Sequence, residues 1–302
     1  ALALLISGIG WFCFTRLKIE AYPDIADTNV IVVAKYSGRA AEEVEQQVTV
    51  PIERALNNVP RVLDRRSRTI FGLAVVQLTF EDGTNDYFAR QQVLERLSAA
   101  ELPDGVVPEL APLTTAVGEI LRYVIDAPPM LTPTQVRDLQ DWVIRPYLLQ
   151  VPGIADITTF GGPLKQFQIL TAPERLRKYG ITIQQLIDAV QQNNQNTGGN
   201  VIERGGQGFA VRGLGAIKSE KDIENIVLTS VSGVPVFVRD VASVEIAPPP
   251  PSGILGYTFT GEGTESNSGT EGIILLRRGE NPSEVLKLVK RKIAQMEESE
   301  LP

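Results

Sequence analysis

The sequence has no histidine, one cysteine and two methionines, and aromatic residues make up only 6% of its 302 positions. Without histidine, the chain cannot hold a Ser-His-Asp triad, a Cys-His pair or a histidine-based zinc site, and one cysteine cannot close an intrachain disulfide. A soft-metal site needs two or three converging sulfurs, and Cys13, Met130 and Met296 are better interpreted as packing or surface residues. We therefore expect no enzyme activity, no catalytic residue, no cofactor and no metal ligand within this stretch of sequence.

Strong positive charge is also missing. The 29 Lys and Arg residues are outnumbered by 36 Asp and Glu residues, which gives a net charge of −7 and argues against a nucleic-acid partner. The Gly-Gly-Gln-Gly stretch at residues 205–208 lacks the Lys-Ser/Thr and the strand-to-helix context of a phosphate-binding loop. Nucleotide binding is therefore excluded as an interpretation of these glycines.

The first 14 residues, ALALLISGIGWFCF, contain no charged side chain. A bilayer-spanning helix needs about 20 apolar residues, so this run is short for a span. Since the sequence opens at alanine rather than methionine, we interpret residues 1–16 as the end of a longer first transmembrane helix. A signal-peptide core and a buried helix of a soluble protein are the alternatives.

Hydrophobic periodicity divides the next hundred residues into a βαββαβ order. We expect strands at residues 29–36, 62–68, 70–80 and 106–110, and helices at 40–57, which Pro51 should kink, and at 85–97. This order is typical of the ferredoxin-like unit, in which two helices cover one face of a four-stranded antiparallel sheet. We therefore predict an α+β fold.

The pattern starts again, but an insertion interrupts it. VPGIADITTF at residues 151–160 is similar to VPRVLDRRSR at 59–68, and it follows a predicted strand at 119–126 and a predicted helix at 134–149. The second copy resumes with strands at 254–260 and 273–277 and a helix at 283–296. The sequence then stops before the last strand of the repeat, so we expect it to be the middle part of a longer protein.

The inserted stretch, residues 163–247, has its own pattern. We predict strands at 165–170, 227–229, 234–238 and 244–246, and a helix at 182–192 with Thr182 as its N-cap. The residues of this helix that should face inward are Ile183, Leu186, Ile187 and Val190. The glycine-rich residues 193–215 predict a long exposed hairpin, and the four prolines at 248–251 predict a stiff linker.

Five segments together resemble the inner-membrane subunit of resistance-nodulation-division (RND) efflux pumps, in the heavy-metal branch of cobalt-zinc-cadmium and copper-silver pumps. They are YPDIADTNV at 22–30, VEQQVTVPIE at 44–53, FEDGTNDYFARQQVLERL at 80–97, LQDWVIRPYLLQVPGIADI at 139–157 and GVPVFVRDVASV at 233–244. Each segment is a weak signal alone, whereas five in the family's order over more than 200 residues are a strong one.

The resemblance implies a layout that agrees with the periodicity. Two porter subdomains would comprise residues 24–112 and residues 113–162 with 253–302, and residues 163–247 would form a docking subdomain. Its hairpin would reach into the neighbouring protomer of a homotrimer, with Gly198, Gly199, Val201, Gly206 and Phe209 as contact candidates. The helix at 85–97 would line the pore of the trimer, with Asp86, Arg90, Gln91, Val93 and Leu94 as candidates.

The resemblance further implies the periplasmic porter and docking region of a proton-driven cation exporter in the bacterial inner membrane. Its partners would be a periplasmic adaptor protein and an outer-membrane channel. Two alternatives stay open: a multidrug RND pump, against which the low aromatic content weighs, and a membrane-tethered periplasmic binding or scaffold module.

Overall fold

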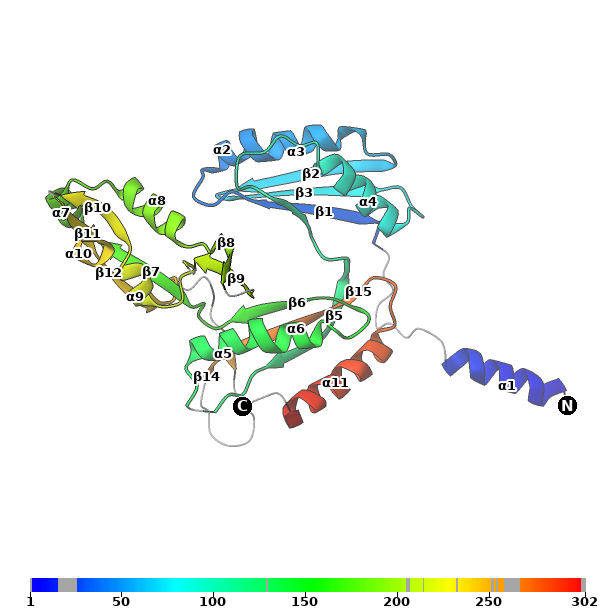
Figure 1. The fold of residues 1–302 in the computed structure, drawn as a ribbon. Helices are drawn as coiled ribbons and strands as arrows, with labels where there is room; N and C mark the ends of the chain where they lie inside the picture. Colours follow the sequence, from blue (N-terminus) through cyan, green and yellow to red (C-terminus); the bar gives the residue numbers. More distant parts are fainter. Residues whose placement is uncertain are drawn as a thin grey trace. The chain divides into compact units, whose positions relative to one another are not determined.

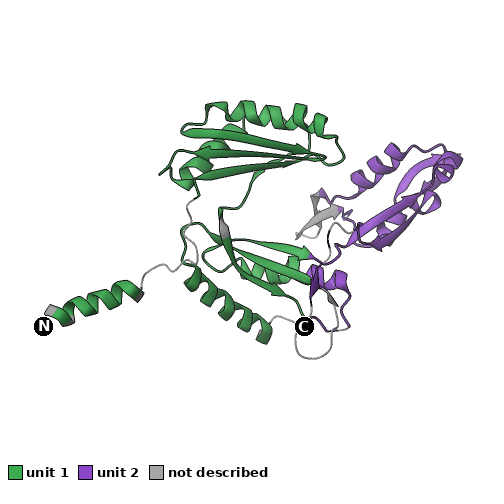
Figure 2. Cartoon of the chain, turned by 180° about the vertical axis from the view of Figure 1, so that it is seen from behind, with its two compact units in different colours: residues 1–126, 139–160, 270–302 green, residues 127–138, 161–269 purple. Residues whose placement is uncertain are grey.

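In the computed structural model, residues 2–15, 26–128, 130–204, 207–213, 215–231, 233–250, 253, 255–257 and 267–299 are described. The chain forms two compact units (Figure 1). Figure 2 shows them in separate colours: unit 1 comprises residues 1–126, 139–160 and 270–302, and unit 2 comprises residues 127–138 and 161–269. Within unit 1 we distinguish a first module, residues 26–112, and a second module, residues 113–126, 139–160 and 270–299.

The first module is built on a four-stranded antiparallel sheet. Its strands β1 (Asn29–Lys35), β2 (Val62–Ile70), β3 (Leu73–Phe80) and β4 (Pro108–Leu110) lie in the order β2-β3-β1-β4. Successive side chains of a strand point to opposite faces, so Val30, Val32 and Ala34 of β1 share the buried face. The βαββαβ order predicted for this part of the sequence is confirmed.

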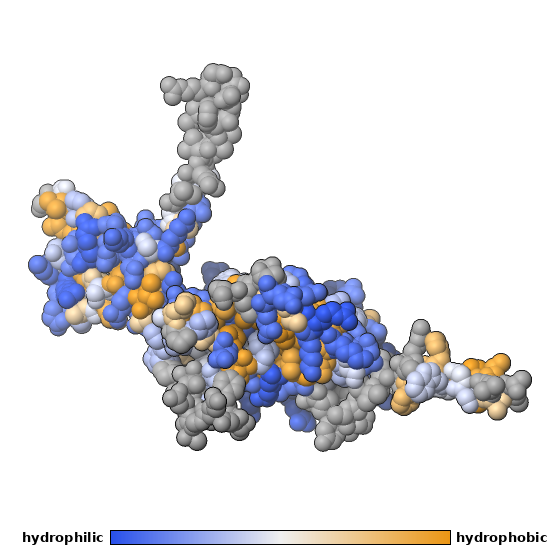
Figure 3. Space-filling model, turned by 90° about the horizontal axis from the view of Figure 1, so that it is seen from below, coloured by the Kyte–Doolittle hydropathy of each residue, from blue (hydrophilic) through white to orange (hydrophobic). Residues whose placement is uncertain are grey.

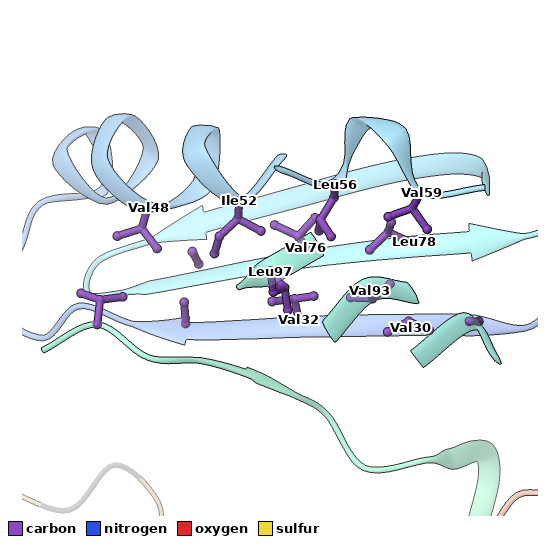
Figure 4. Close-up of a cluster of buried hydrophobic side chains, with 14 of the residues drawn as sticks. Val30, Val32, Val48, Ile52, Leu56, Val59, Val76, Leu78, Val93 and Leu97 are labelled. Atoms are coloured by element: carbon purple, nitrogen blue, oxygen red, sulfur yellow. The ribbon is translucent and has the colours of Figure 1, made fainter. Parts of the chain in front are cut away.

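Helices on one face of this sheet close the core of the first module. The first helical segment runs through α2 (Ala41–Val44), η1 (Glu45–Thr49), α3 (Val50–Ala55) and η2 (Leu56–Asn58), and the second is α4 (Asp86–Leu97). Every fourth residue of the first segment is buried, as is every fourth residue of α4. Figure 4 shows Val48, Ile52 and Leu56 of the first segment pointing toward the sheet. The buried helix residues of this core are Val44, Val48, Ile52, Leu56, Ala89, Val93 and Leu97.

Both modules have a π-helical turn directly before a proline. η1 ends two residues before Pro51, and η3 (Gln140–Ile144) ends two residues before Pro146. A proline inside a helix lacks an N–H, and its ring clashes with the carbonyl four residues earlier. The wider π turn relieves that clash and changes the hydrogen-bond pattern locally. The sequence predicts a kink at Pro51, and the structure places a π turn just before this proline, which lies in the first turn of α3.

The second module repeats the strand arrangement of the first. Strands β5 (Thr114–Val124), β6 (Ile154–Gly161) and β15 (Thr270–Arg277) correspond to β1, β2 and β3 and lie in the order β5-β15-β6. Its helices are α6 (Arg145–Leu148), which continues from α5 (Pro133–Leu139) and η3, and α11 (Pro282–Ser299). Among the described residues, no strand takes the place that β4 has in the first module.

Unit 2 has three antiparallel strand pairs and short helices. The pairs are β7 (Gln166–Thr171) with β12 (Ala242–Ala247), β10 (Val227–Val231) with β11 (Val234–Phe237), and β8 (Thr197–Arg204) with β9 (Gln207–Gly213). The helices are α7 (Pro173–Tyr179), α8 (Ile183–Asn193), α9 (Glu220–Glu224) and α10 (Val238–Val241). A further short pair joins β13 (Gly256–Tyr257) and β14 (Asn267–Ser268).

The inserted segment confirms some predictions and corrects others. Thr182 caps α8, because its hydroxyl oxygen accepts from the Gln185 amide at 3.2 Å. The prediction that Ile183 and Ile187 face inward is wrong, since they are 53% and 42% exposed, whereas Leu186 is buried. The helix α7 is not predicted at all. Most of the strand expected at residues 254–260 lies outside the described residues. The described part of this range contains the short strand β13.

The helix α1 (Leu2–Thr15) exposes apolar side chains around its whole circumference. Leu5, Ile9 and Trp11 are 60%, 55% and 71% exposed, and Figure 3 shows pale and orange residues along this helix. In the described part of the chain, no helix has both the length and the apolar character needed to cross a membrane.

Candidate functional site

Helix α4 carries the first group of candidate residues. Its N-cap is Asn85, whose side-chain oxygen accepts from the amides of Tyr87 and Phe88 at 3.0 and 3.1 Å. Asn and Asp are favoured at this position because their oxygens satisfy amides that have no partner inside the helix. The turn before the cap contains Gly83 with a φ of 73°. The local sequence Gly-Thr-Asn-Asp therefore determines where the helix begins.

The outward face of α4 is apolar at several positions. Tyr87, Phe88 and Leu94 are 63%, 41% and 54% exposed, and Gln91 lies on the same side of the helix. Large apolar groups gathered on one exposed helix face are typical of an interaction surface. We name Tyr87, Phe88, Gln91 and Leu94 the outer face of α4.

Two of the predicted pore residues have partners inside unit 1. The Asp86 carboxylate accepts from Arg278 Nη1 of the second module at 3.1 Å. Arg90 Nη1 donates to the Ala111 carbonyl at 2.7 Å, at the end of β4. Burial lowers the pKa of Arg90, and the nearby Asp86 charge acts in the opposite direction. Asp86 and Arg90 thus hold the start of α4 against neighbouring chain segments.

The five candidates therefore separate into three groups. Gln91 and Leu94 belong to the outer face of α4, Asp86 and Arg90 bind within unit 1, and Val93 is fully buried in the core of the first module. The four-residue spacing of Ala89, Val93 and Leu97 already indicates that Val93 faces inward. The sequence analysis missed Tyr87 and Phe88, although both are aromatic residues next to the buried positions of the same helix. It also missed Arg278, which is distant in sequence.

The β8–β9 hairpin of unit 2 contains the second group of candidates. The backbone of Gly198 pairs with Arg212, that of Val201 with Ala210, and that of Ile202 with Phe209. Gly199 also lies in β8, whereas Gly206 lies outside the described residues. Within residues 193–215, for which the sequence predicts a hairpin, β8 and β9 pair antiparallel.

Asparagine side chains fasten the base of this hairpin. Asn196 Oδ1 accepts from the amides of Gly215 and Ala216 at 3.1 and 3.2 Å, and Asn194 Oδ1 accepts from the Ile217 amide at 3.1 Å. A side chain at Gly215 would place its Cβ 2.5 Å from the Gln195 carbonyl oxygen, so the two chain segments pass in close contact. Sequence reasoning did not assign a role to these asparagines.

The described residues contain no group of three or more His, Cys, Asp or Glu side chains arranged to hold a metal ion. Cys13 is exposed, Met130 is 85% exposed, and Met296 is buried in the core of the second module. The sulfur-bearing residues therefore occupy three different environments.

Comparison with known proteins gives consistent matches along the chain. The model of the AcrB/AcrD/AcrF family matches residues 1–302. The cation efflux system protein CzcA of Alcaligenes sp. (strain CT14) is 38% identical over 300 residues, which cover 96% of this chain and 28% of that protein. The cation efflux system protein CusA of Escherichia coli (strain K12) is 36% identical over 301 residues, which cover 98% of this chain and 28% of that protein.

A solved structure is also similar to this chain. The X-ray crystal structure of a heavy metal efflux pump, in its crystal form II, matches with a TM-score of 0.84 and 38% identity. The match covers 100% of this chain and 30% of the other. The chain thus spans less than a third of the length of the proteins it matches.

Proposed function

Because the chain belongs to the AcrB/AcrD/AcrF family, and its relatives are heavy-metal efflux proteins, we propose that it is the first periplasmic part of a pump that exports metal cations. The observation that carries this proposal is 36–38% identity to metal-cation efflux proteins over at least 96% of the chain. The metal branch of the family is favoured over the multidrug branch by these relatives.

Each unit has a proposed part in the pump. The two modules of unit 1 form the main part of two proposed porter subdomains, residues 24–112 and residues 113–162 with 253–302, each of the ferredoxin-like type. The strand order β2-β3-β1-β4 supports this type in the first module. In the second module, the order β5-β15-β6 among the described strands corresponds to β1-β3-β2 of the first and supports the same type.

Unit 2 contains the proposed docking subdomain, residues 163–247, and its hairpin is the contact to a neighbouring protomer. The residues 198–213 pair mainly with each other, and the base of the hairpin is fixed to unit 2 by Asn194 and Asn196. An arm held firmly at its base is suited to reach another chain. The proposed partners of the complete pump are an adaptor protein and an outer-membrane channel.

The outer face of α4 is the proposed contact around the central pore of a homotrimer, and α1 is the proposed end of a membrane-spanning helix in the inner membrane. Exposed apolar residues support both proposals. A helix of 14 residues is about 21 Å long, which is less than the roughly 30 Å of a bilayer core, so α1 would need further residues to span it.

Transport requires no covalent step in this part of the protein. Two porter modules that shift against each other open and close a path for the ion, and proton binding elsewhere in the pump would bias the two states. The contribution of this chain is then mechanical: it forms walls of the path, subunit contacts and docking surfaces.

Growth assays test the proposal. The full-length protein that contains this chain is produced in a host without its own metal exporters, and resistance to zinc, cobalt, cadmium, copper and silver salts is compared with resistance to ethidium. We expect increased resistance to at least one metal and none to ethidium. Resistance to ethidium alone would favour a multidrug pump, and no resistance to any compound would contradict transport.

A further inference from the structure

Arg278 of the second module contacts two separate parts of the first module. Arg278 follows β15 directly, in the turn that leads to α11. Its Nη1 donates to Asp86 Oδ1 at 3.1 Å and to the Asp27 carbonyl at 3.3 Å, and its Nη2 donates to the Ala26 carbonyl. One guanidinium group therefore joins the first turn of α4 and the segment that precedes β1.

The backbone of Arg278 is also tied to the connection between the modules. Its amide donates to the Leu113 carbonyl at 3.3 Å, and Arg90 of α4 donates to the Ala111 carbonyl two residues earlier. The residues 111–113 link β4 to β5. Arginine contacts from both modules thus converge on this short connection.

The Asp86–Arg278 ion pair is mostly shielded from solvent, which makes its interaction stronger than that of an exposed ion pair. The side chains of Arg278 and Asp86 are 21% and 25% exposed, whereas Arg66 and Asp64 on β2 form a pair at 83% and 47% exposure. Exposed ion pairs contribute little to stability because water and salt screen them, while hydrogen bonds to charged groups in less hydrated places contribute more.

The repeat shows that the turn itself does not need this arginine. The equivalent turn of the first module has Asp82 where the second has Arg278, followed by Gly83 and Gly279 with φ of 73° and 84°. Asn281 then accepts from the Ser283 amide at 3.1 Å, just as Asn85 caps α4. The same turn forms with an exposed aspartate, so the conformation of the turn does not explain the arginine.

We propose that Arg278 is a positioning residue that couples the second module to the start of α4 and to the segment entering β1. The functional role of this link rests on the proposed transport function, because a pump whose porter modules move needs a defined link between them. Arginine suits the task because its planar guanidinium holds donors on several nitrogens in a fixed fork, whereas the three donors of a lysine all lie on one nitrogen. Movement of the second module would then be transmitted to the outer face of α4.

Spin-label distance measurements on this chain test the link directly. Cys13 is changed to serine, and labels are attached to Ser67→Cys on β2 and Lys290→Cys on α11, which are exposed positions in different modules. The distance distribution is recorded for this protein, for Arg278→Gln, for Asp86→Asn and for the double variant. Arg66→Gln is the matched control, because it removes an arginine whose pair lies within a single strand.

We expect one dominant distance in the labelled parent and in the control. Arg278→Gln should lower the ratio of that population to all others by at least about fivefold, as loss of a charge-assisted hydrogen bond predicts. Asp86→Asn should have a smaller effect in the same direction, and the double variant should resemble Arg278→Gln. Arg278→Lys should restore the distribution only in part.

An unchanged distribution in Arg278→Gln, or effects of the two single variants that simply add, would overturn the proposal. The circular-dichroism melting curve of each variant shows whether the modules are still folded, which separates loss of the link from unfolding. If the chain passes this test while the full pump confers no metal resistance, the link stands and the proposed transport function fails.

Discussion

Two glycines with similar positive φ differ in how closely other atoms approach the position of an added Cβ. Gly153 and Gly279 in the second module have φ of 92° and 84°. A Cβ at Gly153 would lie 2.5 Å from Val285 Cγ2 in the core, whereas nothing lies within 4 Å of a Cβ at Gly279. We expect Gly153→Ala to lower the free energy of unfolding by about 2–4 kcal/mol and Gly279→Ala by about 1 kcal/mol. Chemical denaturation measures both, and equal losses would contradict the crowding argument.

The same φ comparison identifies an unusual residue in the first module. Arg61, with a φ of 64°, is the one non-glycine residue with positive φ among those described, and it stands where the second module has Gly153. Its repeat partner shows that glycine fits this turn. The sequence similarity of residues 59–68 and 151–160 reveals the correspondence, but no sequence rule would assign this conformation to an arginine.

Tyr123 should make stability depend on alkaline pH. Its hydroxyl donates to Gln140 Oε1 at 3.0 Å, and burial raises the pKa of Tyr123 to about 12. A raised pKa means that the unfolded chain loses this proton first, so the contribution is complete below pH 10 and is lost as the pH rises toward 12. This rise in the pKa of Tyr123 corresponds to roughly 2–3 kcal/mol of stability.

Unfolding measurements at pH 9 and 11.5 check this expectation. The parent should lose more stability over that interval than Tyr123→Phe, which carries no ionisable group at this position. Absorbance at 295 nm should also show a tyrosine ionisation near pH 12 in the parent that is missing from Tyr123→Phe. A parent and variant with the same pH dependence would show that the hydroxyl does not titrate as described.

At the scale of elements, the base of the β8–β9 hairpin controls how firmly the arm is held. Asn196→Ala removes the acceptor of the Gly215 and Ala216 amides, so the amides of residues 197–213 should exchange about tenfold faster with deuterium. Gln195→Ala is the matched control, since within the described residues its side chain donates to the Gln192 carbonyl at 3.2 Å, before the hairpin begins. Equal exchange in the two variants would mean that Asn196 does not support the hairpin.

Elements with regular apolar spacing are predictable from the sequence, and the others are not. The helix at residues 40–57 is predicted because Val44, Val48, Ile52 and Leu56 recur every fourth position and are all buried. α7 is missed, although Pro173 at its start and Gly180 with a φ of 66° at its end are standard helix signals. Ile183 and Ile187 are misassigned because α8 is apolar on more than its packed side.

At the scale of the whole molecule, the outer face of α4 should mediate trimer formation in the full-length pump. Leu94→Arg places a charge on that face, where Leu94 is 54% exposed, and should reduce both the trimer fraction and metal resistance. Leu63→Arg on β2, at 66% exposure, is the matched control. Light scattering of the purified pump measures the trimer fraction. A stable, active Leu94→Arg trimer would exclude this face from the interface.

The sequence predicts the layout of the molecule better than the contacts within it. The repeated order of elements and the five segments of family resemblance indicate the two modules and the insertion before any coordinates are known. The Asp86–Arg278 pair joins residues 192 positions apart. Such a contact leaves no local pattern in one sequence, because charged residues far apart in the chain show no periodicity that relates them.

Metal uptake into vesicles tests the central claim most directly. Everted inner-membrane vesicles that contain the full-length protein are energised with a proton gradient, and accumulation of radioactive zinc, cobalt or cadmium is measured. We predict uptake of at least one of these ions that stops when the gradient is collapsed and is absent from vesicles without the protein. Equal accumulation with and without the protein, for every metal tested including copper and silver, would contradict the account.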